Sequence, residues 1–416
     1  MELFVGVDLG NYEHQVCVLG VDRRVLEEFA VQANGLGERV LLERLRRLTE
    51  GDLSSCKAGT EATAGPIVEA LQEAGVQVYG INPKQVDRFR DRHSVAGAKD
   101  DRRDALVLAG ALATDLRSFR ALSPVSEETI ELRGLSREAE ELKEDLRRTC
   151  NRIRSELLRY YPQVLELSPG ADERWIWDLL ELAPTPAEAR RKTKGKIAGL
   201  LKANRIRRYK ADEVRAKLKE PQVSAAAGVA KSASKHVRRL IGRARLLDQQ
   251  LREIGRQTDA LLAELTTDDS EAGDGNQSRQ RDAKTLLSLP GAGRAVVATL
   301  LTEATEAISQ RDYQSLRAQA GVAPVTRASG RRRSVSFRRA CNPRLREALF
   351  HFAGVAIQHD TSARAHYDAQ RAAGHGHPRA LRGVGDRLLR IVVSMLRSGS
   401  SYDPSRCVYK RAASAA

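Results

Sequence analysis

The first 120 residues alternate between short apolar runs and helical patterns. Three apolar runs, LFVGVDL, HQVCVLGV and RRVLEEFAVQ, follow one another within residues 3–32 with turn-forming segments between them, which predicts three strands. Residues 38–50 then place apolar side chains at helical spacing. From there strand and helix patterns take turns, up to an apolar helix over about 101–116.

The predicted order is strand, strand, strand, helix, strand, helix, strand, helix. The later strands are CKAGTEA and VQVYGIN, and the helices between and after them are GPIVEALQEAG and PKQVDRFRDRH. A short antiparallel meander continued by parallel strands and helices is typical of ribonuclease-H-like folds. We therefore expect an α/β domain of this fold over residues 1–122.

The middle of the chain is predicted to be almost wholly helical. Residues 127–165 and 229–266 repeat apolar positions every three or four residues among charged ones, as in a coiled coil or a long exposed helix. These helices could contact another subunit or pack within one chain. Between them, residues 190–210 carry ten basic residues and no acidic one. The sequence thus predicts a helical linker domain over 123–268 with a basic segment.

The last third is predicted to be a second, mostly helical domain. The polar, glycine-bearing stretch TTDDSEAGDGNQSRQRD suggests a flexible linker over 269–282. A helical domain over 283–404 and a tail over 405–416 follow. The expected fold class is α/β plus α.

Composition points to a polyanionic partner. The 416 residues include 70 Lys and Arg against 54 Asp and Glu, a formal net charge of +16. This excess favours nucleic acid. No apolar run approaches the roughly 18 residues of a membrane span, the N-terminus lacks a signal-peptide pattern, and the five cysteines are scattered. We expect a cytoplasmic protein with reduced thiols and no membrane partner.

Four carboxylates stand where a ribonuclease-H-like fold would bring them together. Asp8 ends the first strand, Glu61 follows the fourth, and Asp101 and Asp104 lie three apart on one helix. Such a cluster can hold two Mg²⁺ ions, roughly 4 Å apart, for phosphodiester chemistry. Taken singly, each has a plainer interpretation as a turn residue, a loop residue, a helix cap or part of a solvated charged patch.

The helix start AKDDRRDA leaves one ligand open. Asp100 and Asp104, four apart, form an alternative pair to Asp101 and Asp104. If Asp101 and Asp104 are the ligands, Asp100 is expected to cap the helix. Arg102 and Arg103 are expected to face solvent or nucleic-acid phosphates.

The C-terminal domain opens with a helix–turn–helix pattern around PGAG, within residues 284–303. A helix-hairpin-helix-like turn of this kind, including Gly291 and Gly293, can bind a DNA phosphate through backbone N–H groups. A simple helix–helix turn without a ligand is the alternative.

A basic loop follows that turn. Residues 327–346 hold eight arginines and no acid, and RRRSVSF is suited to a short strand or ribbon. A serine among arginines can attack phosphorus, because the guanidinium groups neutralise the phosphoryl oxygens. From the residues alone Ser329, Ser334 and Ser336 are equal candidates, and a plain serine in a DNA-binding loop is the alternative.

The two sites together resemble a known family, the DEDD-type transposases of bacterial insertion sequences, whose relatives include Piv-type DNA invertases. The matching stretches, spread over about residues 3–403, are VGVDLG, GTEATAG, INPKQVDRFR, AKDDRRDA, LLSLPGAG, GVAPVTRASG, NPRLREAL, AHYDAQRAAGHGHPRALRGVGDRLLRIVVSMLR and SSYD. The family's usual Lys-Thr-Asp-x-x-Asp-Ala carries Asp100 here in place of Thr. Alignment on Lys99 and Ala105 favours Asp101 and Asp104 as the pair.

The resemblance implies a RuvC-like N-terminal domain with Asp8, Glu61, Asp101 and Asp104 as Mg²⁺ ligands. It implies Ser329 as the nucleophile that forms a covalent phosphoserine with DNA before strands are exchanged. It also implies a homo-oligomer, a dimer or tetramer, acting on two DNA duplexes, in some members guided by a structured bridge RNA. One proposal for the family builds the site from two subunits.

The residues expected to contact nucleic acid lie in the basic segment, the PGAG turn and the basic loop. They are Arg190, Arg191, Lys192, Lys194, Lys196, Arg205, Arg207, Arg208, Gly291, Gly293, Arg327, Arg331, Arg332, Arg333, Arg338, Arg339 and Arg344.

The expected function is therefore that of a DNA transposase or site-specific recombinase that performs phosphodiester transesterification. A RuvC-like nuclease or Holliday-junction resolvase would use the carboxylates alone. VGVDLG also suits the phosphate-binding turn of actin-like and sugar-kinase ATPases, but a second glycine-rich half is missing. A catalytically inactive nucleic-acid-binding protein would not need four intact acids.

Overall fold

The structure is a computed structural model that describes residues 2–90, 101–119, 121–123, 125–221, 223–266, 274–329 and 332–407. The chain divides into two compact units, Met1–Ser126 and Glu127–Ala416. The break lies four residues beyond the end of the expected ribonuclease-H-like domain at 122.

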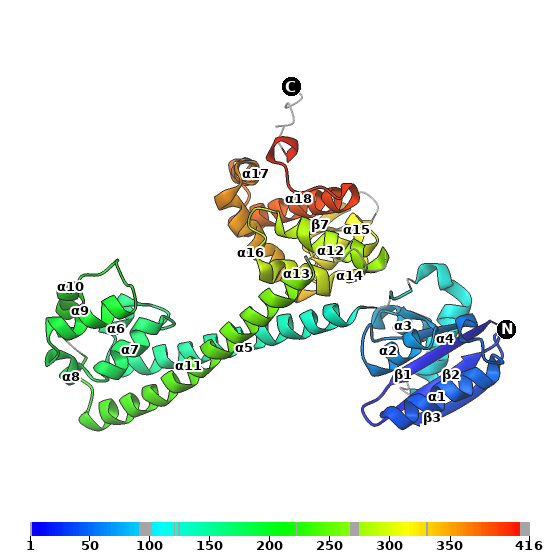
Figure 1. The fold of residues 1–416 in the computed structure, drawn as a ribbon, viewed down its shortest axis with the longest axis horizontal. Coiled ribbons are helices and arrows are strands. Elements are labelled where there is room, and N and C mark those ends of the chain that lie inside the picture. Colours follow the sequence, from blue (N-terminus) through cyan, green and yellow to red (C-terminus); the bar gives the residue numbers. More distant parts are fainter. Residues whose placement is uncertain are drawn as a thin grey trace. The chain divides into compact units, whose positions relative to one another are not determined.

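The N-terminal unit contains a five-stranded sheet in the order β3-β2-β1-β4-β5 (Figure 1). Strands β1 (Leu3–Leu9), β2 (Glu13–Leu19) and β3 (Val25–Gln32) are antiparallel neighbours. Strands β4 (Cys56–Thr60) and β5 (Gln77–Gly80) continue the sheet in parallel with β1. This confirms the antiparallel meander followed by parallel strands that the hydrophobic pattern predicts.

Helices cover both faces of this sheet. Leu3, Val5 and Val7 of β1 pack in one core with α1 (Gly35–Leu48) and α2 (Pro66–Glu73). Phe4 points to the other face and packs in a second core with α3 (Pro83–Arg90) and α4 (Asp101–Asp115). Because β1 is buried on both faces, its sequence is a continuous apolar run rather than an alternating one.

The C-terminal unit begins with a long helical hairpin. Helix α5 (Glu127–Tyr160) leads out and α11 (Ala227–Glu264) leads back (Figure 1). Leu132 shares a core with Leu261, whereas Ile153 shares another with Ile241, so the two helices are antiparallel. Both predicted long helices are present, and they pack against each other within one chain.

Five short helices form a small domain at the far end of the hairpin. They are α6 (Gln163–Leu167), α7 (Arg174–Leu182), α8 (Pro186–Arg190), α9 (Lys194–Ala203) and α10 (Ala211–Lys219). Trp175 and Trp177 are buried in its core beside Tyr160 and Tyr161. The basic segment over 190–210 is therefore part of a small domain that has its own aromatic core.

The remaining helices form the C-terminal domain, and α16 and α18 contribute many of the buried residues of its core. They are α12 (Asp274–Leu287), α13 (Arg294–Glu303), α14 (Thr305–Ser309), α15 (Tyr313–Gln319), α16 (Pro343–His359), α17 (Thr361–Ala372) and α18 (His377–Ser398). The prediction of a flexible linker over 269–282 is wrong for its second part, because helix α12 already starts at residue 274. Ala283 and Leu286 of α12 are buried in the domain core, and that packing outweighs the poor helix propensity of the Gly- and Asp-rich sequence before them.

Candidate active site

The first two predicted ligands lie side by side at one edge of the N-terminal sheet. Strands β1 and β4 are parallel, with Gly6 level with Gly59. Continued by two residues, this register sets Asp8 level with Glu61, each at the carboxyl end of its strand. Asp8 is half-buried and pairs with Gln15 of β2 in the sheet, whereas Glu61 is exposed.

The third ligand reaches this edge because α4 crosses β1 unusually closely. A Cβ atom on Gly6 would lie 1.9 Å from the carbonyl oxygen of Ala105 and 2.6 Å from the backbone nitrogen of Ala109. Only glycine permits such an approach. The close crossing sets the first turn of α4, with Asp104, beside the strand that ends in Asp8.

Asp104 is buried, with 5% of its surface exposed, and it already has a cationic partner. The Nε of Arg90 donates a hydrogen bond of 2.8 Å to its Oδ1. The same guanidinium pairs with Asp87 at 2.9 Å. The sequence did not predict a role for Arg90, which is the last residue of the INPKQVDRFR motif and of helix α3.

The other predicted groups of this helix fall on its exposed side. Asp101 is the first residue of α4 and is exposed, as are Arg102 and Arg103. The solvent-facing position expected for the two arginines is confirmed. Asp100 lies outside the described residues.

The side chains as they stand do not form a closed metal cage. Within the described ranges, no three His, Cys, Asp or Glu side chains converge closely enough to hold a metal ion. Their chemistry nevertheless suits Mg²⁺, which takes a few carboxylates plus water and phosphate oxygens. In this structure the buried carboxylate of Asp104 is paired with the guanidinium of Arg90.

The predicted basic loop is a two-stranded hairpin. Strand β6 (Val325–Ser329) pairs with β7 (Arg332–Ser336), and Ser329 stands opposite Arg332. Residues Thr326–Ser329 and all of β7 are exposed. Within the described residues Arg327, Arg332 and Arg333 form no ion pair, while Gly330 and Arg331 lie outside them. The ribbon expected for RRRSVSF is confirmed, with Ser329 as the last residue of its first strand.

Aromatic stacking anchors the base of this hairpin. The guanidinium of Arg382 lies 4.7 Å from the ring centre of Phe337, and that of Arg346 lies 5.9 Å away. Arg338 donates from its Nε to the carbonyl oxygen of Ala323 at 3.2 Å. The hairpin therefore projects from a fixed base while its strands meet solvent on both faces.

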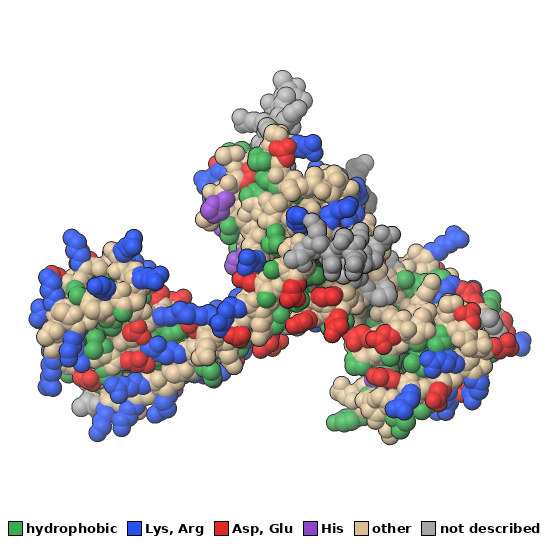
Figure 2. All heavy atoms as spheres, in the orientation of Figure 1, with side chains coloured by type: hydrophobic (Ala, Val, Ile, Leu, Met, Phe, Trp, Pro, Cys, Tyr) green, Lys and Arg blue, Asp and Glu red, His purple; other side chains and the backbone are tan. Residues whose placement is uncertain are grey.

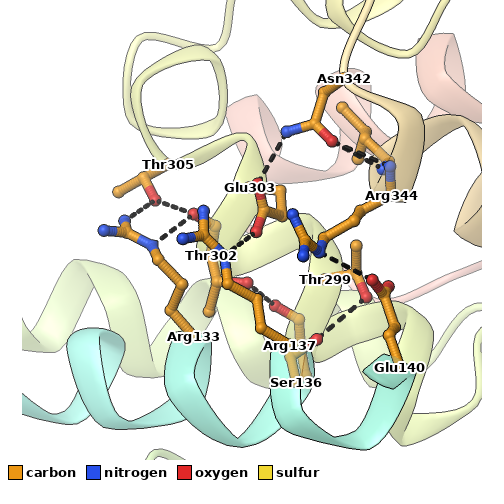
Figure 3. Close-up of polar contacts among 12 residues, drawn as sticks. Arg133, Ser136, Arg137, Glu140, Thr299, Thr302, Glu303, Thr305, Asn342 and Arg344 are labelled. Carbon is orange, nitrogen blue, oxygen red and sulfur yellow. Dashed lines mark hydrogen bonds and ion pairs between the residues drawn. The ribbon is translucent and has the colours of Figure 1, made fainter. Parts of the chain in front are cut away.

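A polar network connects Asn342, the N-cap of α16, to helix α5 through Glu303 (Figure 3). Glu303 accepts a hydrogen bond from Arg137 and one from Asn342, both at 2.7 Å. Asn342 caps α16 by accepting from the backbone N–H of Arg344 and Leu345. Burial acts to raise the pKa of Glu303, but the hydrogen bonds from Arg137 and Asn342 outweigh it and hold the pKa below its ordinary value.

The PGAG turn has a structural reason for its first glycine. Gly291 has a φ of +87°, and a Cβ there would lie 2.7 Å from the backbone nitrogen of Ala356 in α16. Close packing on α16 thus explains Gly291 without a ligand. Gly293 is the N-cap of α13 with open space beside it, so phosphate binding at that position stays a prediction.

Three of the residues expected to contact nucleic acid are engaged with acids instead. Arg344 pairs with Glu140 at 2.8 Å, Arg208 with Glu173 at 2.6 Å, and Lys194 with Asp212. Figure 2 nevertheless shows Lys and Arg side chains spread over the small domain of α6–α10.

Comparison with known proteins gives the family. Residues 5–162 match a family model described as "Transposase", and residues 283–368 match that of the "Transposase IS116/IS110/IS902 family". The predicted transposase of the IS117 mini-circle of Streptomyces coelicolor is 30% identical over 98% of this chain and 96% of its own length. The chain belongs to the IS110/IS116 transposase family.

Two further relatives agree. The predicted transposase y4uE of Sinorhizobium fredii is 44% identical, over 50% of this chain and 58% of its own length. The insertion element IS116 protein of Streptomyces clavuligerus is 26% identical over 97% of the chain. The two family models of this IS110/IS116 transposase coincide with the two sites, because one spans Asp8 to Asp104 and the other spans Ser329. None of its described helices has the length and apolarity needed to cross a bilayer.

Proposed function

We propose that this transposase cleaves and exchanges DNA strands through a covalent phosphoserine at Ser329, with Mg²⁺ held by Asp8, Glu61, Asp101 and Asp104. The observation that carries the proposal is the meeting of Asp8, Glu61 and the first turn of α4 at one sheet edge. These residues come from three separate stretches of sequence, and membership of a transposase family supports a shared role for them in DNA cleavage.

The four carboxylates would hold a pair of Mg²⁺ ions when DNA is bound, with water and phosphate oxygens completing the coordination. When bound, Mg²⁺ stabilises negative charge on the scissile phosphate. In this proposal Asp104 is the buried ligand, whose carboxylate Arg90 positions, and Asp8 and Glu61 are supplied by the ends of two adjacent strands.

The serine step conserves atoms and charge. The Oγ of Ser329 forms a bond to phosphorus and loses its proton, while one bridging P–O bond breaks and the departing oxygen gains a proton. The reverse reaction on another strand completes the exchange. Arg327, Arg332 and Arg333 stand on the same hairpin, form no ion pair with any described residue, and can neutralise the phosphoryl oxygens.

The partners follow from the same proposal. The enzyme acts on double-stranded DNA in the cytoplasm as a homo-oligomer, and a structured guide RNA is bound along the basic small domain. An exposed hairpin fixed only at its base is suited to a composite site, in which the serine of one subunit meets the carboxylates of another.

The test is a denaturation-resistant adduct. Purified protein is incubated with Mg²⁺, copurifying RNA and a supercoiled plasmid that carries the gene with its flanking DNA. We expect wild-type protein to form a covalent protein–DNA adduct and Ser329→Ala to form none. Ser334→Ala and Ser336→Ala, on the neighbouring strand, are matched controls that keep the adduct. Cleavage without any adduct would instead support a nuclease that uses the carboxylates alone.

A further inference from the structure

A second basic surface lies on α18, away from the serine hairpin. Two hollows of about 540 and 310 Å³ adjoin there and share Arg390, Ser394 and Ser398. The remaining lining residues include Arg387, Arg397 and Arg406, three further residues with hydroxyl groups, and one acid, Asp403. Together the two hollows form a groove whose polar lining is mostly hydrogen-bond donors, with Ile391, Val393 and Met395 as its apolar part.

The helix pattern explains why these side chains share a face. Arg387, Arg390, Ser394, Arg397 and Ser398 follow one another at intervals of three, four, three and one, which keeps them on one side of α18. The opposite side is buried in the domain core through residues such as Leu388, Val392 and Leu396. The core therefore fixes the helix, and the helix fixes the spacing of the arginines.

Two of the arginines are held in place by neutral groups. Arg397 donates to the carbonyl oxygen of Arg311 at 2.9 Å. Arg390 donates to the hydroxyl of Tyr313 at 3.4 Å and stacks 5.3 Å from its ring centre. Within the described residues neither forms an ion pair. Their positions are thus fixed while their charge is not compensated.

Two acids close to this face already have cationic partners. Asp386 accepts from the Nε of Arg317 at 2.9 Å, from a terminal guanidinium nitrogen of Arg317 at 2.7 Å, and from the hydroxyl of Tyr313 at 2.8 Å. Asp403 pairs with Arg406 at 3.5 Å. Fixed guanidinium groups interleaved with serine hydroxyls are the donors that bind phosphodiester oxygens in a nucleic-acid backbone.

We propose that the groove along α18 binds the phosphate backbone of duplex DNA, independently of sequence. The proposal rests on the proposed function only in taking DNA as the ligand. It assigns to Arg390 and Arg397 the task of holding the duplex, separate from the reacting serine. No base edge needs to be read for this purpose.

The experiment measures the salt dependence of binding to a mixed-sequence duplex by fluorescence anisotropy. For Arg390→Gln with Arg397→Gln, affinity should fall at least about tenfold, and the slope of log K against log salt should fall by about 2, since each phosphate contact contributes about 0.9. Arg390→Lys with Arg397→Lys should keep most of that slope, which a purely structural role would not predict.

The matched control removes two other exposed arginines, Arg364 and Arg371 of α17, by change to Gln. It should leave the slope nearly unchanged. The groove proposal is overturned if the Gln double variant, folded by circular dichroism, keeps the wild-type slope, or if only binding to an RNA duplex weakens. Assaying the serine adduct on the same preparations separates the two proposals. A wild-type protein that forms no adduct refutes the serine chemistry, and a changed slope still supports the groove.

Discussion

The carboxylate edge and the serine hairpin are held in opposite ways. Asp104 is buried, reached by a helix that touches the backbone of β1, and paired with Arg90. Ser329 is exposed at the end of a two-stranded ribbon that is anchored at its base. The difference teaches that the fold buries and fixes one half of the proposed site, whereas it leaves the other half exposed to solvent.

The largest expected effect on DNA cleavage comes from a change at Asp104, in the buried half of the proposed site. Asp104→Asn should lower Mg²⁺-dependent DNA cleavage at least about 100-fold, because a ligand to a metal that supplies several kcal/mol is lost. Plasmid nicking under matched Mg²⁺ measures this. Asp87→Asn removes the other partner of Arg90 and is the control expected to stay active. Equal activity in the two variants would show that Asp104 holds Arg90 and nothing more.

The next effect concerns the close crossing of α4 and β1. Gly6→Ala should destabilise the protein by about 1–3 kcal/mol, because the added methyl group forces backbone apart. Denaturant unfolding measures the loss, and activity should fall with it as Asp104 moves away from Asp8. Gly35→Ala, where a Cβ meets open space, should change stability by less than about 1 kcal/mol. Wild-type cleavage activity in Gly6→Ala would contradict the claim that the close crossing of α4 and β1 positions Asp104.

A smaller effect is expected at the network behind the hairpin. Glu303→Gln should cost about 1–3 kcal/mol at neutral pH, since the new NH₂ group faces the donor of Arg137 or Asn342. Because the folded pKa of Glu303 lies below its ordinary value, its stabilisation is present above pH 4.5 and is lost as the pH falls through the folded pKa.

Urea unfolding at several pH values measures this dependence. The stabilities of wild type and Glu303→Gln should converge in acid. The exposed Glu347→Gln on α16 is the control, and it should follow wild type throughout. A gap between wild type and Glu303→Gln that persists at low pH would contradict the ionic account.

The smallest stability effect is expected at the base of the hairpin. Phe337→Ala removes the ring that stacks on Arg382 and Arg346 and should cost about 1 kcal/mol or less in global stability. It should nevertheless loosen the hairpin, which hydrogen exchange across β6 and β7 would detect. Val335→Ala on the exposed ribbon is the control. Unchanged exchange in Phe337→Ala would mean that the aromatic anchor does not hold the hairpin.

Sequence periodicity was sufficient for the sheet and the long helices. Apolar runs and turns locate the strands, and the ribonuclease-H-like topology that their order indicates sets β4 beside β1, with Asp8 and Glu61 at the strand ends. A short strand or ribbon at RRRSVSF was also predicted, and β7 lies there, but its pairing with β6 was not. These features depend on neighbours in sequence or on one simple topology.

Long-range partners could not be predicted in the same way. Arg90 reaches Asp104 from another helix, and Glu303 bonds Arg137 across 166 residues. Nothing in local spacing marks either pair. Residues 274–282 read as a linker by composition, and only packing of α12 in the C-terminal core makes them helical.

The most direct measurement of the central claim is the position of the covalent bond. The protein–DNA adduct formed with Mg²⁺ is digested with protease and nuclease, and the peptide that carries the nucleotide is sequenced by mass spectrometry. The account predicts that the nucleotide is attached to Ser329. Attachment to Ser334, Ser336 or any residue outside the hairpin would contradict it.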